Sequence, residues 1–363
     1  MKTHAKATTA TERFVDRLFL CAAAFPLFLL LALVLGLSMA KPAKADEIVC
    51  SGTNLLTELA AENPAALEEV RRQAAETPNG SGLLWRVEKE GVAPSYLFGT
   101  MHMSDPRVVT LPGDAREAFD GAERVVIETT DILDQSKMAA AMFKRPDLMM
   151  FTGKETLGDH LDEAEREAVA DALKARGIPF ASVKKMKPWM LISLVALPVC
   201  EIERKEAGMP ILDLKLAEDA QNAGKELLGL ETAVEQLDAM ASLPMEMHVR
   251  GLVETLALGD GLNDVMETMV SLYAEGETGM FWPLIRVAIP EQQGASGDYA
   301  AFDRAMVKAR NGTMAERARP ILNEGNAFIA VGALHLPGEE GLIELLRADG
   351  YTVEGVRKIW GSG

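Results

Sequence analysis

The chain has 363 residues, of which 48% are hydrophobic and 25% are charged, and its net charge is −17. This composition is that of a globular protein and excludes a disordered or fibrous one. Residues 1–45 hold six of the 37 basic residues but only two of the 54 acidic ones, so the remaining chain carries a net charge of −21. Phosphate groups would repel such a surface, which excludes binding to nucleic acid, or to an anionic membrane through a basic face.

The N-terminal region contains an apolar segment. Residues 18–40 are 23 consecutive positions without a charge, and four basic residues precede them. The basic flank stays in the cytoplasm, so the rest of the chain is expected to be exported. Residues 43–45 have the small-x-small form of a signal peptidase site, but the apolar core is longer than the ~7 to 15 residues of a secretory signal. The sequence therefore predicts a signal peptide or an N-terminal membrane anchor over 1–45. The body, 46–363, would lie in the periplasm or be held at the inner membrane by an uncleaved helix.

Two cysteines belong to the predicted exported body. Cys21 lies in the apolar segment, which leaves Cys50 and Cys200. An even pair outside the reducing cytoplasm predicts a disulfide, which would tie the start of the body to the middle of the chain. The alternative is two unrelated buried thiols. A zinc site with four cysteine ligands is excluded by their number.

No linker or low-complexity tract divides the chain after residue 46, so one domain is predicted over 46–363. Its elements, in chain order, are a helical segment over 54–76, strands over 83–88 and 95–98, a helix over 114–121, a strand over 124–128, a helix-rich stretch from 154, strands over 226–231 and 327–331, a helix over 337–347 and a strand over 351–354. This succession predicts an α/β fold with a central, mostly parallel sheet. The helices of about 154–320 are expected to form a cap over one edge of that sheet.

Two of the predicted strands end in the same pattern of a glycine, two residues and a histidine. In YLFGTMHMSD and IAVGALHLPG this pattern places His102 and His335 where the chain leaves its strand. Glu128 and Glu231 also end predicted strands. Ligands of open α/β sheets bind outside the carboxyl ends of the strands, so these four side chains would meet at one edge. Imidazoles and carboxylates together suit a divalent ion such as Zn, Mn or Co, whose identity stays open.

Each of these residues alone has a simpler explanation, as a hydrogen-bonded turn histidine or as a glutamate that caps a helix or pairs with a cation. The repeated pattern favours a site. His4, His160 and His248 stand outside it. The sequence has no GxSxG serine elbow and no glycine-rich phosphate loop, which argues against a serine hydrolase and against nucleotide binding.

Four longer segments can be considered together: SYLFGTMHMSD, VVIETTD, ILDLKLAEDAQNAGKELLGLETAVEQL and ARNGTMAERARPILNEGNAFIAVGALHLPGEEGLIELLRADGYTVEGV. In combination they resemble the TraB/GumN family, which is related to the Tiki metalloproteases and to the EreA/ChaN-like fold group. The resemblance covers roughly residues 50–358. It implies a metal held by the two histidines and the two glutamates named above. It also matches Arg310 and Asn311 to an Arg-Asn pair of the family, where the guanidinium could anchor a substrate carboxylate. An internal ion pair is the alternative for Arg310.

Together these observations predict a metal-dependent hydrolase, with a peptidase as the first choice and a peptide or protein as substrate. His102, His335 and Glu128 would ligate the ion, and Glu231 would be the general base or a fourth ligand. A second hypothesis is a non-catalytic periplasmic protein that binds a peptide, haem or a metal ion in the same cleft. A third assigns the protein to envelope assembly and leaves the cleft empty.

Overall fold

The computed structural model describes residues 48–288 and 295–356. The predicted signal peptide or anchor, with its apolar segment 18–40, lies outside these residues. Within the described ranges, no helix combines the length and the apolar character needed to cross a membrane. The described residues cover the predicted exported body apart from its two ends and residues 289–294.

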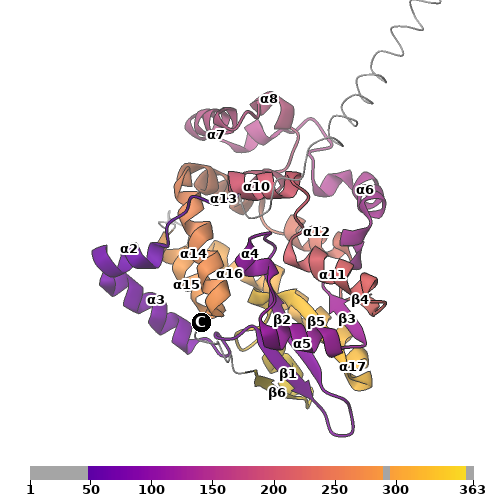
Figure 1. Ribbon diagram of the computed structural model, residues 1–363. Helices are drawn as coiled ribbons and strands as arrows, with labels where there is room; N and C mark the ends of the chain where they lie inside the picture. Colours follow the sequence, from indigo (N-terminus) through magenta and orange to yellow (C-terminus); the bar gives the residue numbers. More distant parts are fainter. Residues whose placement is uncertain (1–47, 289–294, 357–363) are drawn as a thin grey trace, which may run out of the picture. The chain divides into compact units, whose positions relative to one another are not determined.

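A six-stranded sheet forms the core of this body (Figure 1). Its strands are β1 (Leu84–Glu88), β2 (Ser95–Thr100), β3 (Arg124–Ile127), β4 (Glu226–Gly229), β5 (Ala327–Gly332) and β6 (Thr352–Gly355). Their order is β4-β3-β5-β2-β1-β6, with β4, β3, β5 and β2 parallel and β1 antiparallel to both β2 and β6. The predicted α/β fold with a mostly parallel sheet is confirmed, and all six predicted strands are present.

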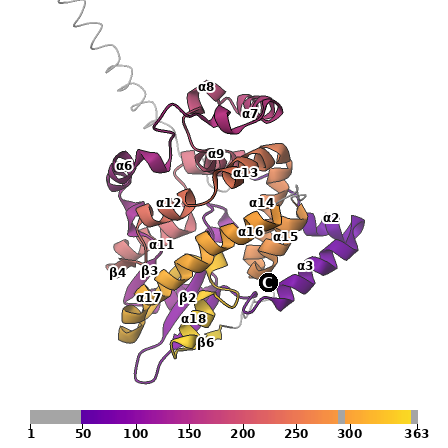
Figure 2. The ribbon, with the colours of Figure 1, turned by 180° about the vertical axis from the view of Figure 1, so that it is seen from behind.

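Strand β5 shows why the parallel strands are almost continuously apolar. Its side chains alternate between two hydrophobic clusters: Phe328 and Ala330 belong to one, and Ile329 and Val331 to the other. A strand covered on both faces needs apolar residues at every position. Helices α5 (Gly113–Gly121) and α11 (Leu212–Asn222) contribute to the first cluster. Helices α17 (Ala309–Glu324) and α18 (Leu342–Ala348), both labelled in Figure 2, contribute to the second.

The predicted helical segment 54–76 is two helices, α2 (Leu55–Glu62) and α3 (Pro64–Glu76). Asn63 separates them, because its backbone N–H donates to Leu59 O in α2 while its side chain accepts from Ala66 N in α3. Pro64 follows at the first position of α3, where a missing N–H costs no helical hydrogen bond. One residue thus ends one helix and begins the next.

The helix-rich stretch after residue 154 is confirmed. It contains, besides α11 and α17, helices α7 (Glu163–Ala175), α8 (Phe180–Val183), α9 (Pro188–Val195), α10 (Val199–Glu206), α12 (Ala233–Ala241), α13 (Met245–Leu258), α14 (Gly261–Glu275), α15 (Phe281–Ala288), α16 (Ala295–Phe302) and a π-helical turn, Asp303–Lys308. Helices α7, α9 and α13 share a hydrophobic cluster of their own. Two short helices precede this stretch, α4 (Pro106–Val109) and α6 (Gln135–Lys144). The helix predicted over 337–347 begins only at Leu342, since residues 333–335 form a 3-10 turn and Gly338 has a φ of +93°.

Candidate functional site

The four predicted site residues all follow parallel strands that are neighbours in the sheet. His102 lies two residues after β2, Glu128 directly after β3, Glu231 two residues after β4 and His335 three residues after β5. Parallel strands present their carboxyl ends on one side, so the four residues share one edge of the sheet. His102, Glu128 and His335 line a cavity of about 460 Å³. Glu231 is not among the residues that line it.

His102 is held by a carboxylate that the sequence analysis did not identify. Its Nδ1 lies 2.7 Å from Oδ2 of the buried Asp213, whose Oδ1 accepts a hydrogen bond of 2.7 Å from the Thr100 hydroxyl. A carboxylate only accepts, so Nδ1 carries the proton and Nε2 is the atom that can act toward the cavity. The facing Asp213 raises the pKa of the His102 imidazole to about 9.

His335 is oriented in the same way by a neutral partner. Its Nδ1 lies 2.7 Å from Asn311 Oδ1, and the Asn311 amide donates in turn to Glu340 O at 2.8 Å. Burial lowers the pKa of the His335 imidazole to about 4, so the ring is neutral at neutral pH. Its Nε2 lies 3.8 Å from Glu128 Oε1, which is too long for a hydrogen bond.

Glu128 stands at the centre of the polar network. Its Oε1 accepts from Gly332 N at 2.7 Å, and its Oε2 accepts from Gln236 Nε2 at 2.9 Å and from Arg310 NH2 at 2.6 Å. Burial raises the pKa of Glu128, but the facing His335, His102 and Arg310 outweigh that effect and hold the pKa at about 2. Glu128 is therefore ionised although it is buried.

Arg310 joins the two glutamates. Its NH2 lies 2.6 Å from Oε2 of Glu128 and 2.6 Å from Oε2 of Glu231, and its Nε lies 3.1 Å from both oxygens of Glu231. This is the internal ion pair that the sequence left open as an alternative to substrate binding. Asn311 is 1% exposed and both of its polar atoms have protein partners. The predicted roles of Arg310 and Asn311 toward substrate, and of Glu231 as base, stay predictions.

The glycines of the repeated pattern have a steric role. A Cβ at Gly332 would lie 3.1 Å from Glu128 Oε1, and one at Gly99 would lie 3.0 Å from Ala333 Cβ. A side chain at Gly332 would press on the carboxylate, and one at Gly99 would push apart the turns that carry the two histidines. Glycine lets these backbones approach closely.

The hydrogen-bond partners of these residues suit a divalent ion, although the possible ligand atoms of His102, Glu128 and His335 do not all lie within 4.8 Å of one another. Each imidazole gives its Nδ1–H to a protein oxygen, an arrangement that fixes the tautomer of metal-binding histidines and leaves Nε2 for the metal. Two ligands that each lie ~2.0 to 2.2 Å from one zinc ion are within about 4 Å of each other, and the separation of His335 Nε2 from Glu128 Oε1 falls in that range. The ionised Glu128 and the neutral His335 are in the protonation states that ligation requires, whereas His102, with a pKa of about 9, would have to release its Nε2 proton to bind the ion.

Three residues of this network were missed: Thr100, Asp213 and Gln236. The sequence held one indication of Asp213, which stands among the apolar residues Leu212 and Leu216 at the start of α11. A buried carboxylate in the first turn of an apolar helix needs a polar partner. Nothing in the sequence indicated that His102, 111 residues earlier, is that partner.

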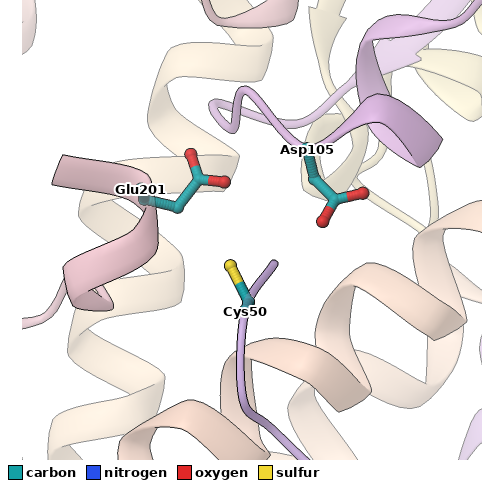
Figure 3. A group of neighbouring side chains, drawn as sticks. All are labelled: Cys50, Asp105 and Glu201. Atoms are coloured by element: carbon teal, nitrogen blue, oxygen red, sulfur yellow. The ribbon is translucent and has the colours of Figure 1, made fainter. Parts of the chain in front are cut away.

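A second group of possible metal ligands consists of Cys50, Asp105 and Glu201, whose side chains face one another in Figure 3. The sulfur of Cys50 is bonded to Cys200, with the two Cα atoms 5.3 Å apart, so the predicted disulfide is present and no thiolate is available. Arg204 NH1 lies 3.1 Å from Asp105 and 2.5 Å from Glu201. Because Arg204 pairs with both carboxylates and Arg107 pairs with Asp105 as well, we interpret this group as a buried ion-pair network and not as a metal site.

This network anchors the loop that carries His102. Glu201 Oε2 accepts from the Ser104 backbone N–H at 2.9 Å and from the Ser104 hydroxyl at 2.7 Å. Glu201 follows Cys200 directly, so the disulfide and the anchoring carboxylate belong to the same turn of α10. The loop between β2 and α4 is thus fixed both at Asp213 and at Glu201.

Two histidines and a glutamate follow the carboxyl ends of the parallel strands, beside helices that line the same cavity. They define an α/β protein with a candidate centre for a divalent ion. The chain belongs to the TraB/PrgY/gumN family, whose profile matches residues 83–355. No solved structure matches it.

Its relatives include animal metalloproteases. The chain is 25% identical over 317 residues to Metalloprotease TIKI2 of Danio rerio, covering 76% of this chain and 61% of that protein. It is 24% identical over 321 residues to Metalloprotease TIKI1 of Homo sapiens, covering 76% and 62%. For the Metalloprotease TIKI homolog of Nematostella vectensis, the identity is 24% over 324 residues, covering 77% and 68%. The chain thus spans about 61% of the length of the Danio rerio TIKI2 protein.

Proposed function

We propose that this protein is a metal-dependent hydrolase that cleaves peptides or proteins outside the cytoplasm. The observation that carries the proposal is the pair of imidazoles after β2 and β5, each held through Nδ1, that line one cavity together with the ionised Glu128. The relatives named as metalloproteases support peptide hydrolysis as the reaction.

His102 and His335 would ligate the ion through Nε2. When bound, a divalent ion polarises the carbonyl group of the scissile bond and lowers the pKa of water beside it. Glu128 Oε1, which lies 3.8 Å from His335 Nε2, would act either as third ligand or as the carboxylate that accepts a proton from water. Arg310 holds Glu128 ionised and in place. Glu231, with both oxygens on Arg310, could reach the cavity only after Arg310 moved.

Export is the second part of the proposal. The uncharged stretch 18–40 behind basic residues supports translocation of the body, and the disulfide between Cys50 and Cys200 is typical of an oxidising compartment. We place the protein in the periplasm, free or attached by an uncleaved helix. Fractionation of cells that express the full chain, followed by N-terminal sequencing of the recovered protein, tests this and shows whether the 43–45 site is cleaved.

The metal is tested by mass spectrometry of the full chain, purified without chelator or affinity histidines and supplied with Zn, Mn or Co. We expect about one ion per chain, and a loss of occupancy in His102→Ala and in His335→Ala but not in the control His160→Ala, which lies outside the site. Full occupancy in the double variant would refute the centre. A digest of a peptide library then tests the reaction, and a chain that keeps its ion but cleaves nothing would support the binding-protein alternative.

Glu128→Gln and Glu231→Gln separate the roles of the two carboxylates. If Glu128 is a ligand, Glu128→Gln lowers metal occupancy. If it accepts the proton, the variant keeps its ion and loses cleavage. Glu231→Gln is expected to keep both the ion and most of the cleavage, and loss of cleavage alone in this variant would assign the base to Glu231.

A further inference from the structure

Two cavities meet at the candidate centre. The larger, of about 460 Å³, and a smaller one of about 250 Å³ are both lined by His102, Glu128 and Gln236. These three side chains therefore stand between two spaces. A substrate whose reacting bond lies at His102 and Glu128 can extend into both of them, one on each side of that bond.

The larger cavity has flexible apolar walls. Its methionines include Met240 of α12, Met269 of α14 and Met306 of the π-helical turn, and its aromatic residues include Trp189 of α9 and Phe281 of α15. Methionine is unbranched and polarisable, so such walls adapt to long side chains of different shape. This space suits a large apolar group.

The smaller cavity has stiffer walls. Ile127 at the end of β3, Ile132 and Ile211 line it together with Ala233 and Thr129. β-branched side chains are restricted at χ1 and cannot make room for a bulky group. The smaller space therefore suits a short aliphatic side chain.

The charged groups of both cavities are already paired. Arg310 binds Glu128 and Glu231, and Asp213 binds His102 and Thr100. In the metal-free chain, each charged group among the described lining residues has an oppositely charged partner within the site, so none is left free to neutralise a charged side chain or chain terminus of a substrate. Burying an unpaired charge costs several kcal/mol in general, so charged occupants are disfavoured.

From these features we infer that the site takes an internal, uncharged stretch of polypeptide. A long apolar side chain such as Met, Leu or Phe occupies the larger cavity, and a short aliphatic side chain occupies the smaller one. The inference deepens the proposed peptidase function, on which it rests for the identity of the ligand as a peptide. It adds that the preferred peptide bond lies away from both ends of its chain and between residues of unequal size.

Binding is measured first, with the full chain and a chelator present so that no cleavage occurs. The probes are hexapeptides with acetylated and amidated ends that differ at one position, and calorimetry gives Kd, with the fluorescence of Trp189 as a second readout. Replacing the large apolar residue by Ala should weaken binding roughly tenfold. Replacing it by Glu or Lys should abolish measurable binding.

Variants of the walls assign each side chain to its cavity. Met240→Glu should abolish the preference for the large apolar residue, whereas Met150→Glu, the same change at a half-exposed methionine outside both cavities, should leave it unchanged. Ile132→Phe should shift the preference at the second position to Gly or Ala. Circular dichroism and thermal unfolding check that each variant is folded.

The results distinguish this inference from the proposed function. Selective binding without cleavage under any metal would refute the peptidase and keep the two-cavity assignment. Cleavage without side-chain preference, or tighter binding of peptides with free charged ends, would keep the peptidase and overturn the assignment.

Discussion

The carboxylate of Asp213 determines which nitrogen of His102 faces the cavity. Its two oxygens lie 2.7 Å from His102 Nδ1 and 2.7 Å from the Thr100 hydroxyl, so it is fixed at both ends. Asp213 is buried, whereas the His102 side chain is 59% exposed. A buried carboxylate that accepts from Nδ1 of an exposed imidazole fixes the orientation of the ring and leaves its Nε2 accessible to a metal ion. Asp213 is therefore a positioning residue of the candidate centre, although it comes from a helix and not from a strand.

Asp213→Asn tests this relationship in two ways. An asparagine keeps the size of the side chain but not its charge. We expect metal affinity to fall roughly 10- to 100-fold, as it does when a hydrogen-bond acceptor of a ligating histidine is lost in other proteins. The pKa of His102, about 9 in the metal-free folded protein, lies above its unfolded value of 6.5. The stability from this pair is thus fully present below pH 6.5 and lost as the pH rises through 9. Urea unfolding of chelated protein across this range should show the loss in the parent chain but not in the variant. An equal loss in both would contradict the role of Asp213.

Much of the fold could be predicted from the sequence because the parallel strands have clear local sequence patterns. Strand β5 is apolar at successive positions between turn residues, and the Gly-x-x-His segments mark where β2 and β5 end. The choice of edge for His102 and His335 followed from the parallel arrangement alone. These features depend on neighbours in sequence, which a single chain displays.

The pairing of charges could not be obtained in this way. Arg310 contacts Glu128 across 182 residues and Glu231 across 79, and such contacts depend on how α17 packs on the sheet. The same holds for Asp213 and for the anchoring of Ser104 by Glu201, 97 residues apart. Local sequence patterns indicate which residues end a strand, but they do not indicate which distant side chain forms a hydrogen bond or ion pair with those residues.

The buried state of His335 should appear in the acid stability of the metal-free protein. Its folded pKa of about 4 lies below its unfolded value of 6.5, so its contribution is present above pH 6.5 and is lost as the pH falls through 4. The full shift corresponds to about 3 kcal/mol. Burial also lowers the pKa of His248, which acts with the same sign. We therefore expect His335→Gln to flatten this part of the profile but not to abolish it, as measured by urea unfolding of chelated protein. An unchanged slope would show that the ring of His335 is not buried as a neutral group.

Arg310 should matter more for stability than an exposed arginine of the same helix. Arg310→Gln would leave Glu128 and Glu231 facing each other without a cation, at a cost of roughly 3 to 5 kcal/mol. Arg317 pairs with Glu235 on the surface, each side chain 42% exposed, so Arg317→Gln should cost no more than about 1 kcal/mol. Adding Glu231→Gln to Arg310→Gln should recover part of the loss because one negative charge is removed. Chemical unfolding measures the free energy of unfolding of the parent chain, the two single variants and the double variant. Equal losses of stability in Arg310→Gln and Arg317→Gln would mean that the buried ion pairs contribute no more than the exposed one.

The disulfide and Glu201 are expected to act on the same loop by different routes. The Cys50–Cys200 bond joins residues 150 positions apart and so restricts the unfolded chain. The double variant Cys50→Ala, Cys200→Ala should therefore be less stable by roughly 2 to 5 kcal/mol. Reductant should have the same effect on the parent chain and none on the double variant.

Glu201→Gln should leave the disulfide intact but weaken the hold on Ser104, because the amide cannot accept from Ser104 and also from Arg204 as a carboxylate does. The loop that carries His102 then loses one of its two anchors. We expect metal affinity to fall in this variant. Metal affinity should stay unchanged in the control Glu267→Gln. This variant removes a carboxylate that lies 2.7 Å from Arg107 in the same region. Calorimetric titration with the metal measures both, and non-reducing peptide mapping checks the disulfide. Equal affinities in the two variants, with the disulfide present, would show that Asp213 alone positions His102.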